Sequence, residues 1–321
     1  MAKSKNIQKK SKSKEQIFKE VTDHVISSLE NGNIPWEKPW RSVNGVQVKP
    51  MNINGRAYRG WNLIRLSSEM AERGLTDPRF LTFGQIVKAG ALLAKGSKSV
   101  VVDYWIKIYF HEDNPDCKLT KKDYLKHDDS CDKKRLTWYT LKQYRVFSVE
   151  DVTGLNLKSI EVEIEENKEN FDAVLEADKV VEDYVTSENI KLNYKGDRAY
   201  YSPMLDEITV PETKNFKGNN AYYNTIFHEI GHSTGHQSRL NREGVANNKP
   251  IKFGDELYAK EELVAEMTSG FLCASTGTNS RFNKKNRVAY IQSWITALKE
   301  DSTLVPQASQ FAQKAFDYIM K

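Results

Sequence analysis

Two histidines and a glutamate lie close together in the sequence, at His228, Glu229 and His232. On a helix, positions i and i+4 share one face, so the two histidines can each place a ring nitrogen on one metal ion at roughly 2.0–2.1 Å. Glu229 points about 100° away from His228, where it can reach a water molecule at the metal without ligating the metal itself. The spacing is H-E-x-x-H, the signature of zinc hydrolases. It predicts zinc (Zn2+) as the cofactor and Glu229 as a catalytic base.

An exposed amphipathic helix with two ordinary histidines is the alternative explanation. The chain has six histidines in 321 residues. That composition gives H-E-x-x-H a chance probability on the order of one percent. Ile226, Phe227 and Ile230 surround the motif with apolar side chains, as in a helix that is pressed into a core. A charged Glu229 in such a helix needs a partner such as a metal centre, which favours the metal site.

A catalytic zinc site needs a third protein ligand. His236 follows a glycine that is typical of a helix end, so we expect it to lie beyond the break. Residues 258–273 are the stronger source, because Glu262 and Glu266 stand four apart on a helical stretch whose other face is apolar. Such a helix could give Glu262 to the metal and leave Glu266 to accept an N–H from a ligating histidine. We therefore favour Glu262 as the ligand over Glu261, Glu266 and His236.

The composition is that of a globular protein without a membrane segment. The 321 residues are 39% hydrophobic and 11% aromatic, which is sufficient for two domains with cores of their own. The sequence shows no long apolar run and no apolar leader, so we expect a cytoplasmic protein without a membrane partner. The cysteines are widely spaced, as is usual in a reduced compartment.

Charge is distributed unevenly along the chain, although the net formal charge is only +5. Residues 1–14 are rich in lysine and contain no acid, which is typical of a disordered basic arm. Residues 156–168 are acidic and lack core-forming side chains, so we predict a linker there. The predicted domains are therefore residues 15–155 and residues 169–321.

Aromatic and cationic residues are interleaved in the first predicted domain. Bases can stack on flat rings, cations can bind phosphates and glycines allow close approach, and a sequence-tolerant site for single-stranded DNA needs all three. A tryptophan-rich structural corner with arginines facing solvent is the alternative. The predicted DNA-binding residues are Trp36, Trp40, Arg41, Arg56, Tyr58, Arg59, Trp61, Asn62, Lys95 and Lys98.

Local patterns predict an α+β fold. Helices are indicated from Ser13 to about Glu30 and from Thr82 to Ala89, each opened by a side chain that can cap the first turn. β-Branched and aromatic residues indicate several strands, with a polar insertion at residues 111–135. The predicted strands are 100–109, 141–149, 190–194, 198–202 and 207–211. The remainder of the second domain is predicted to be helical, with these last three strands as a small antiparallel sheet.

Several short motifs follow one another in a distinctive order. They are Pro35-Trp36, Pro39-Trp40, Gly55-Arg-x-Tyr58-Arg59-Gly60-x-Asn62, Leu81-Thr82-Phe83, Lys95-Gly96, Tyr144-Arg-Val-Phe147-Ser-Val, His228-Glu-Ile-Gly-His-Ser-Thr-Gly-His236 and Ser238-Arg-Leu-Asn-Arg242. In this order they resemble the ArdC-type antirestriction proteins of plasmids, integrative elements and phages. The similarity covers nearly the whole chain apart from the basic arm and the 111–135 insertion.

The resemblance implies an N-terminal domain that binds single-stranded DNA and is shared with some plasmid primases. It also implies a C-terminal domain with a zincin-like metallopeptidase fold. Together these imply protection of incoming DNA from host restriction. The protein would act in the cytoplasm, including that of a recipient cell when it is transferred with DNA.

Two classes of function stay open. In the first, the chain is a metallopeptidase delivered to single-stranded DNA, whose substrate is a host restriction enzyme or another DNA-bound protein. In the second, it is a single-strand-binding shield or a conjugation accessory protein, and its zinc is structural. Glu229 favours the first class, because a structural zinc site has no use for a base.

Overall fold

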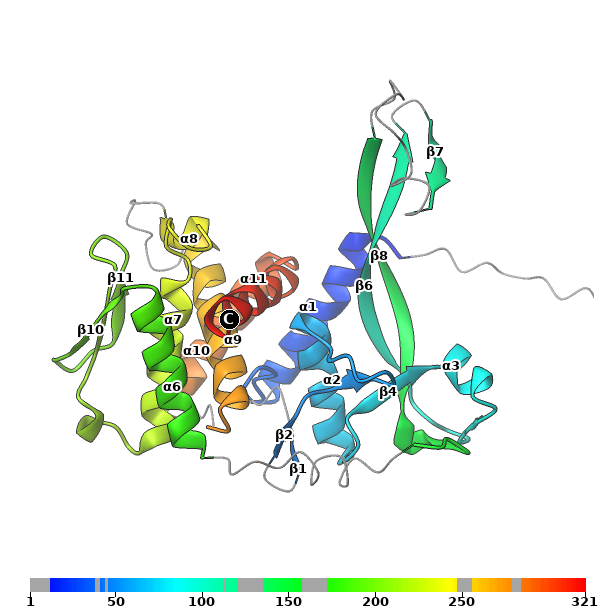
Figure 1. Ribbon diagram of the computed structural model, residues 1–321, viewed down its shortest axis with the longest axis horizontal. Coiled ribbons are helices and arrows are strands. Elements are labelled where there is room, and N and C mark those ends of the chain that lie inside the picture. Colours follow the sequence, from blue (N-terminus) through cyan, green and yellow to red (C-terminus); the bar gives the residue numbers. More distant parts are fainter. Residues whose placement is uncertain are drawn as a thin grey trace, which may run out of the picture.

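The computed structural model describes residues 12–37, 41–43, 46–111, 114–120, 135–157, 172–246, 256–278 and 284–321. Helices and small sheets share these residues, so the predicted α+β class is confirmed. Figure 1 shows one half of the molecule built of helices around α7 and α9, and another half built around the strands β4, β6 and β8. Within the described ranges, no helix is both long and apolar enough to cross a membrane.

Several helices begin where a side chain satisfies the free amides of the first turn. Ser13 and Thr82 each form a capping box with a glutamine three residues later, and these boxes confirm both predicted helix starts. Asp172 caps α6 in a similar way. The helices are α1 (Lys14–Glu30), α2 (Gly60–Arg73), α3 (Phe83–Lys88), α6 (Ala173–Ser187), α7 (Asn219–Ser233), α8 (Glu243–Ala246), α9 (Glu256–Ser275), α10 (Lys284–Glu300) and α11 (Leu304–Ile319).

The larger sheet has five strands in the order β3-β4-β8-β6-β7. Its strands are β3 (Met51–Asn52), β4 (Arg79–Thr82), β6 (Val100–His111), β7 (Asn114–Leu119) and β8 (Arg135–Ser148). β6 and β8 pair in antiparallel fashion along the whole of β6, and this β6–β8 ribbon extends away from the helices (Figure 1). β7 lies inside the predicted insertion and pairs with the end of β6. Two short antiparallel pairs lie in the same part of the sequence: β1 (Arg41–Val43) with β2 (Val46–Val48), and β5 (Leu92–Leu93) with β9 (Val152–Thr153).

The smaller sheet has the order β10-β12-β11, with β10 at Lys191–Tyr194, β11 at Tyr200–Ser202 and β12 at Glu207–Val210. β11 and β12 form the predicted antiparallel hairpin. β10, however, runs parallel to β12, so the sheet is mixed and the prediction of an antiparallel sheet is corrected. β12 is the central strand, with β10 on one side and β11 on the other, and its Ile208 and Val210 are completely buried.

One hydrophobic core connects the two predicted domains. It contains Val21, Val25 and Leu29 of α1 together with residues of the C-terminal helices, and α1 packs against α10 and α11. Trp36 is completely buried in this core, with its ring edge-on to Trp294 at a centroid distance of 5.3 Å. The predicted linker lies mostly outside the described residues, so the domain boundaries stay a prediction.

Candidate metal centre

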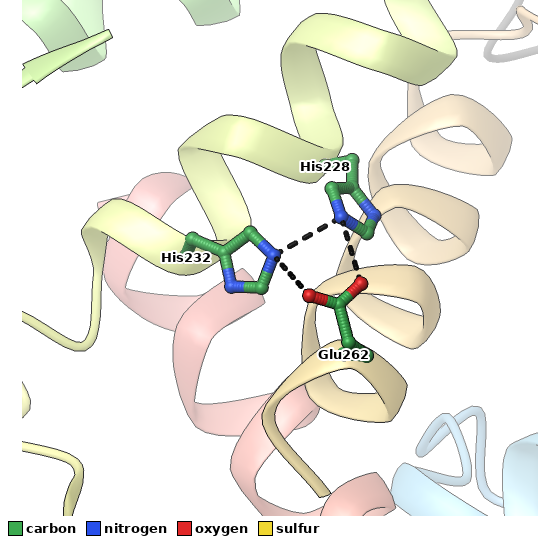
Figure 2. A group of neighbouring side chains, drawn as sticks. All are labelled: His228, His232 and Glu262. Carbon is green, nitrogen blue, oxygen red and sulfur yellow. Dashed lines mark hydrogen bonds and ion pairs between the residues drawn. The ribbon is translucent and has the colours of Figure 1, made fainter. Parts of the chain in front are cut away.

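α7 and α9 lie in close contact because one residue at their interface lacks a side chain. A Cβ atom on Gly231 would lie 3.1 Å from the Cα of Ala265 and 3.3 Å from its carbonyl oxygen. The close approach puts the H-E-x-x-H face of α7 directly against the acidic face of α9. Figure 2 shows the result, with His228 and His232 on one helix and Glu262 on the other.

Three side chains converge at this contact. One ligand atom from each of His228, His232 and Glu262 lies within 4.8 Å of the other two. The two Nε2 atoms are 3.0 Å apart, and the Glu262 carboxylate lies 3.6 Å from Nε2 of His228 and 3.5 Å from Nε2 of His232. Two imidazoles and a carboxylate are the donor set of a catalytic zinc site, so this cluster can hold a divalent metal ion.

The other nitrogen of each imidazole faces a second carboxylate. Nδ1 of His228 lies 3.4 Å from Oε1 of Glu266, and Nδ1 of His232 lies 3.3 Å from Oε1 of Glu261. A histidine that donates its Nδ1 proton to a carboxylate keeps a lone pair on Nε2, which is the nitrogen that points into the cluster. The arrangement therefore fits a metal ion better than it fits a buried network of charges alone.

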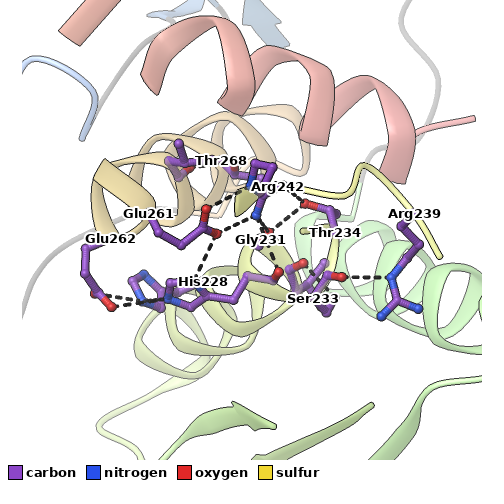
Figure 3. Close-up of polar contacts among 12 residues, drawn as sticks. His228, Gly231, Ser233, Thr234, Arg239, Arg242, Glu261, Glu262 and Thr268 are labelled. Atoms are coloured by element: carbon purple, nitrogen blue, oxygen red, sulfur yellow. Dashed lines mark hydrogen bonds and ion pairs between the residues drawn. The ribbon is translucent and has the colours of Figure 1, made fainter. Parts of the chain in front are cut away.

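Arg242 holds Glu261 in place. Its Nε donates to Oε2 of Glu261 at 2.9 Å, and its other nitrogens donate to Oγ1 of Thr234 at 2.6 Å and to the carbonyl of Gly231 at 2.8 Å (Figure 3). Sequence reasoning missed this role of Arg242 and treated Glu261 only as an alternative ligand. The available signal was the Ser238-Arg-Leu-Asn-Arg242 motif, which follows the metal helix directly.

The electrostatics of the site favour the ionised forms of Glu262 and Glu261, but not that of Glu266. Burial by itself raises the pKa of Glu262, but its hydrogen bond to His228 and the nearby His232 lower that pKa to about 2. Burial also opposes ionisation of Glu261, and Arg242 outweighs it, so the pKa of Glu261 lies below its usual value. The pKa of Glu266 is raised instead, because its burial exceeds the effect of His228. Burial disfavours the charged form of His228, yet the carboxylates of Glu266 and Glu262 raise its pKa well above the usual value.

Glu229 and His236, the remaining predicted residues of this region, lie in different surroundings. Glu229 is buried on α7 and interacts electrostatically with His228. Nδ1 of His236 lies 2.7 Å from Oγ of Ser238, and His236 does not belong to the cluster of three. The structure thus brings Glu262, and not His236, to the two histidines.

Two tryptophans predicted to bind DNA are buried. Trp36 is 0% exposed and Trp61 is 7% exposed, and the guanidinium of Arg65 lies 5.1 Å from the centre of the Trp61 ring. A base stacks only on an open ring face, so the prediction that these two rings bind bases is corrected. Asn62 has a structural role too, because its side chain forms two hydrogen bonds with the backbone of Asp103 on β6.

The other predicted DNA-binding residues are distributed over separate places. Arg56, Lys95 and Lys98 are exposed, and Tyr58 is half-buried. Arg59 forms an ion pair with Asp317 of α11. Trp40 and the side chain of Arg41 lie outside the described residues.

Exposed aromatic side chains gather instead on the β6–β8 ribbon. Trp138 is 67% exposed there, and Tyr104, Trp105, Tyr139 and Tyr144 are exposed as well. The strand register puts Tyr104, Trp138 and Tyr144 on one face and Trp105 and Tyr139 on the other. Sequence reasoning took these residues as signs of a strand and missed them as a surface.

Comparison with known proteins gives matches in both halves of the chain. Residues 15–147 match the family described as the N-terminal domain of anti-restriction factor ArdC. Residues 179–311 match the zincin-like metallopeptidase family. The DNA primase TraC of Escherichia coli is 32% identical over 313 residues, which cover 96% of this chain. The chain spans only 27% of the length of that primase and 20% of a second TraC.

Two crystal structures of the antirestriction protein ArdC from plasmid R388 are similar over 95% of this chain. The metal-free structure has a TM-score of 0.65 at 28% identity, and 96% of it is covered. The Mn(II)-bound structure has a TM-score of 0.69 at 30% identity, and 97% of it is covered. With the cluster of His228, His232 and Glu262, the metal-bound relative indicates a divalent-metal site in this chain. The chain belongs to the ArdC antirestriction family, with an ArdC-type N-terminal domain followed by a zincin-like metallopeptidase domain.

Proposed function

We propose that this chain binds single-stranded DNA and hydrolyses a protein that acts on or is bound to that DNA, and so protects incoming DNA from restriction. The observation that carries the peptidase part is the buried Glu229 beside a cluster of three ligands. Three protein ligands leave a position open for water or substrate, as catalytic zinc sites do. A structural site would close that position with a fourth side chain.

His228, His232 and Glu262 would hold the ion, which we predict to be zinc. When bound, zinc acidifies a water molecule and polarises a carbonyl group. Glu229 would accept the proton of the attacking water at its carboxylate and then return it to the nitrogen of the departing amine. Glu266 and Glu261 would keep the Nδ1 protons of the two histidines in place, so that both rings stay aimed at the cluster.

The substrate backbone has a place to lie beside α7. β11 is an edge strand of the smaller sheet and packs against α7, the helix that carries both histidines. An edge strand presents backbone N–H and C=O groups that can pair with an extended peptide. We propose β11 as the strand that orients a protein substrate towards Glu229.

The β6–β8 ribbon supports the DNA-binding part of the proposal. Its exposed rings have the open faces that stacking requires, and cations lie among them. Nζ of Lys107 lies 5.7 Å from the centre of the Tyr139 ring, and Nζ of Lys14 lies 5.7 Å from that of Trp105. Rings for bases and ammonium groups for phosphates are thus combined on the face of Trp105 and Tyr139, and the opposite face offers the rings of Tyr104, Trp138 and Tyr144.

The peptidase part predicts that Glu229→Ala abolishes protection of incoming DNA but retains the metal. Glu229 acts as a base and not as a ligand, so metal content and DNA affinity should match those of the wild type. Protection is measured as the efficiency of transfer into a restricting recipient relative to a non-restricting one. Glu182→Ala, which removes an exposed acid of α6, is the control and should behave as the wild type. Full protection by the Glu229 variant would make the chain a DNA-binding shield.

The DNA-binding part predicts that Trp138→Ala weakens the binding of single-stranded DNA by about 1–3 kcal/mol, the usual contribution of one stacked base. Lys107→Ala should reduce the slope of log affinity against log salt concentration by about one. The control is Leu175→Ala, which removes an exposed apolar side chain of α6, outside the ribbon. Affinities come from fluorescence anisotropy with a labelled oligothymidine. Equal affinity of the Trp138 and Leu175 variants would exclude the ribbon face of Trp138 as the stacking surface.

A further inference from the structure

The third proposed metal ligand, Glu262, has a partner unlike those of the two histidines. Both histidines face a carboxylate of α9 with their Nδ1 atoms. Glu262 instead accepts a hydrogen bond from the hydroxyl group of Tyr258. The proposed hydrolysis does not use this hydroxyl group.

Tyr258 lies one helical turn before Glu262 on α9. Residues four apart share one face of a helix, so the two side chains point to the same side. That side is turned towards α7, because the Glu262 carboxylate lies 3.6 Å from Nε2 of His228 and 3.5 Å from Nε2 of His232. Tyr258 is therefore directed to the contact between the two helices, next to the proposed ligand.

Packing alone does not account for Tyr258. α9 enters the hydrophobic core through Leu263, Val264 and Met267, which are almost completely buried. Tyr258 is only half-buried, and it is not among the residues of α9 that form this core in the described part of the chain. Its hydroxyl group, rather than its ring, thus contacts the site.

A hydrogen bond to Glu262 has a specific effect on a metal ligand. The terminal torsion of a glutamate is broad, so a free carboxylate turns easily and can offer one or both oxygens to an ion. A donor on one oxygen restricts this rotation and leaves the other oxygen for the ion. A hydroxyl group does so without placing a positive charge beside the ion, as a lysine or an arginine would.

We propose that Tyr258 is a positioning residue, which holds one oxygen of the Glu262 carboxylate so that only the other oxygen binds the metal ion. All three ligands then have a partner that fixes their orientation. The proposal rests on the divalent-metal site and not on hydrolysis, so it applies to a DNA-binding shield as well as to a peptidase.

The test is titration of the metal-free full-length protein with Co2+, whose visible absorption depends on the number and arrangement of its ligands. Tyr258→Phe keeps the ring and removes only the hydroxyl group. It should weaken Co2+ binding about ten-fold, the lower end of the usual effect of such a partner. It should also change the intensity of the visible bands, because Glu262 can then bind through both oxygens. The urea midpoint of the metal-free variant should match that of the wild type.

Tyr223→Phe is the matched control. The hydroxyl group of Tyr223 donates to Oδ1 of Asp178 at 2.8 Å. The control therefore removes the same kind of bond from α7, the helix that carries both histidines, but from a carboxylate outside the metal cluster. Its Co2+ affinity and absorption should match those of the wild type.

Three outcomes would overturn the positioning role of Tyr258. They are unchanged affinity of Tyr258→Phe, an equal loss of affinity in both variants, and a loss of affinity with an unchanged absorption spectrum, which would indicate packing. Protection by Glu229→Ala is measured independently of Co2+ binding. A failure of the proposed hydrolysis and a failure of this proposal are therefore distinguishable.

Discussion

Glu261 is bound to two functional side chains at once, the imidazole of His232 and the guanidinium of Arg242. Arg242 is almost completely buried, with 3% of its side chain exposed. A buried guanidinium without a carboxylate is costly, so Glu261 stabilises the fold and orients a proposed metal ligand at the same time. These two effects can be separated by experiment.

We expect Glu261→Gln to lower metal affinity by about 10–100-fold, because His232 loses the carboxylate that fixes its ring. The free energy of unfolding of the metal-free protein should fall by about 3–5 kcal/mol, because Arg242 loses its charge partner. Metal titration and urea denaturation measure the two quantities.

Glu262→Gln is the matched control for this prediction. It changes the neighbouring proposed ligand and leaves the pair of Glu261 and Arg242 intact. Metal binding should be lost. The metal-free protein should lose less stability than with Glu261→Gln, because the more deeply buried charge, the Arg242 guanidinium, keeps its partner. Equal losses of stability in the two variants would contradict the role assigned to Arg242.

The sequence predicts the histidines and glutamates of this site, but it does not predict that Arg242 binds Glu261. His228 and His232 are four apart on one helix, and Glu262 and Glu266 are four apart on another, so local periodicity indicates both pairs. Arg242 comes from the loop after α7 and meets Glu261 only when α7 and α9 pack. The spacing of residues within one helix or strand cannot predict a contact between two different elements.

At the scale of elements, Arg239 ties the β11–β12 hairpin to the end of α7. Its side chain is 1% exposed, and Nε donates to the carbonyl of Ser233 at 2.7 Å. The same guanidinium donates to Asp206, in the turn of the hairpin, and to the hydroxyl of Tyr201 on β11. The strand proposed to hold substrate is thereby fixed relative to the metal helix.

This connection predicts a pH-dependent contribution of Asp206 to stability. Burial alone raises the pKa of Asp206, but Arg239 and Tyr201 lower it below its usual value. A lowered folded-state pKa means that the stabilisation is present at neutral pH, diminishes below about pH 4 and is lost as the pH falls through the folded-state value.

Wild-type protein should therefore be more stable than Asp206→Asn at pH 7, and the difference should shrink on acidification. Asparagine tolerates the positive φ of 51° at this position, so the substitution changes the charge without adding strain. Urea denaturation at several pH values measures the difference. Asp183→Asn, at an exposed position of α6, should show no such trend. A constant difference across the pH range would exclude the ion pair as its cause.

Elements with local determinants were predictable, and pairings between distant segments were not. The capping boxes at Ser13 and Thr82 involve residues three apart, so they can be recognised in any sequence. The direction of β10 depends on which side of β12 remains free in the folded sheet. The exposure of the aromatic side chains on the ribbon likewise depends on where the helices end. The alternation of residues along a strand does not predict this.

At the scale of the whole molecule, the shared core makes the two halves depend on one another. The backbone of Trp36 passes so close to α9 that a Cβ atom on Gly270 would collide with the carbonyl oxygen of Trp36. α1 adds a buried apolar face against α10 and α11. We therefore expect the full chain to unfold in a single transition.

Gly270→Ala should destabilise the protein by about 1–3 kcal/mol, the usual cost of overpacking a core. Ellipticity and tryptophan fluorescence should lose their signals together as the chain is denatured, before and after the substitution. Gly84→Ala is the control, because a Cβ atom there meets nothing within 4 Å. Gly84 lies in α3, so alanine should leave stability unchanged or raise it slightly. Two separate transitions in the wild type would contradict the shared core.

The close approach of the Trp36 backbone to Gly270 also limits which recombinant genes can encode a folded protein. A crossover near the predicted linker would combine the Trp36 segment of one parent with the α9 of another. Any parent with a larger residue than glycine at this position would yield a chimera that folds poorly. The match to TraC spans both halves together, as expected if they are inherited as one unit. Phylogenetic trees computed separately from the two halves of ArdC relatives should therefore have the same branching order.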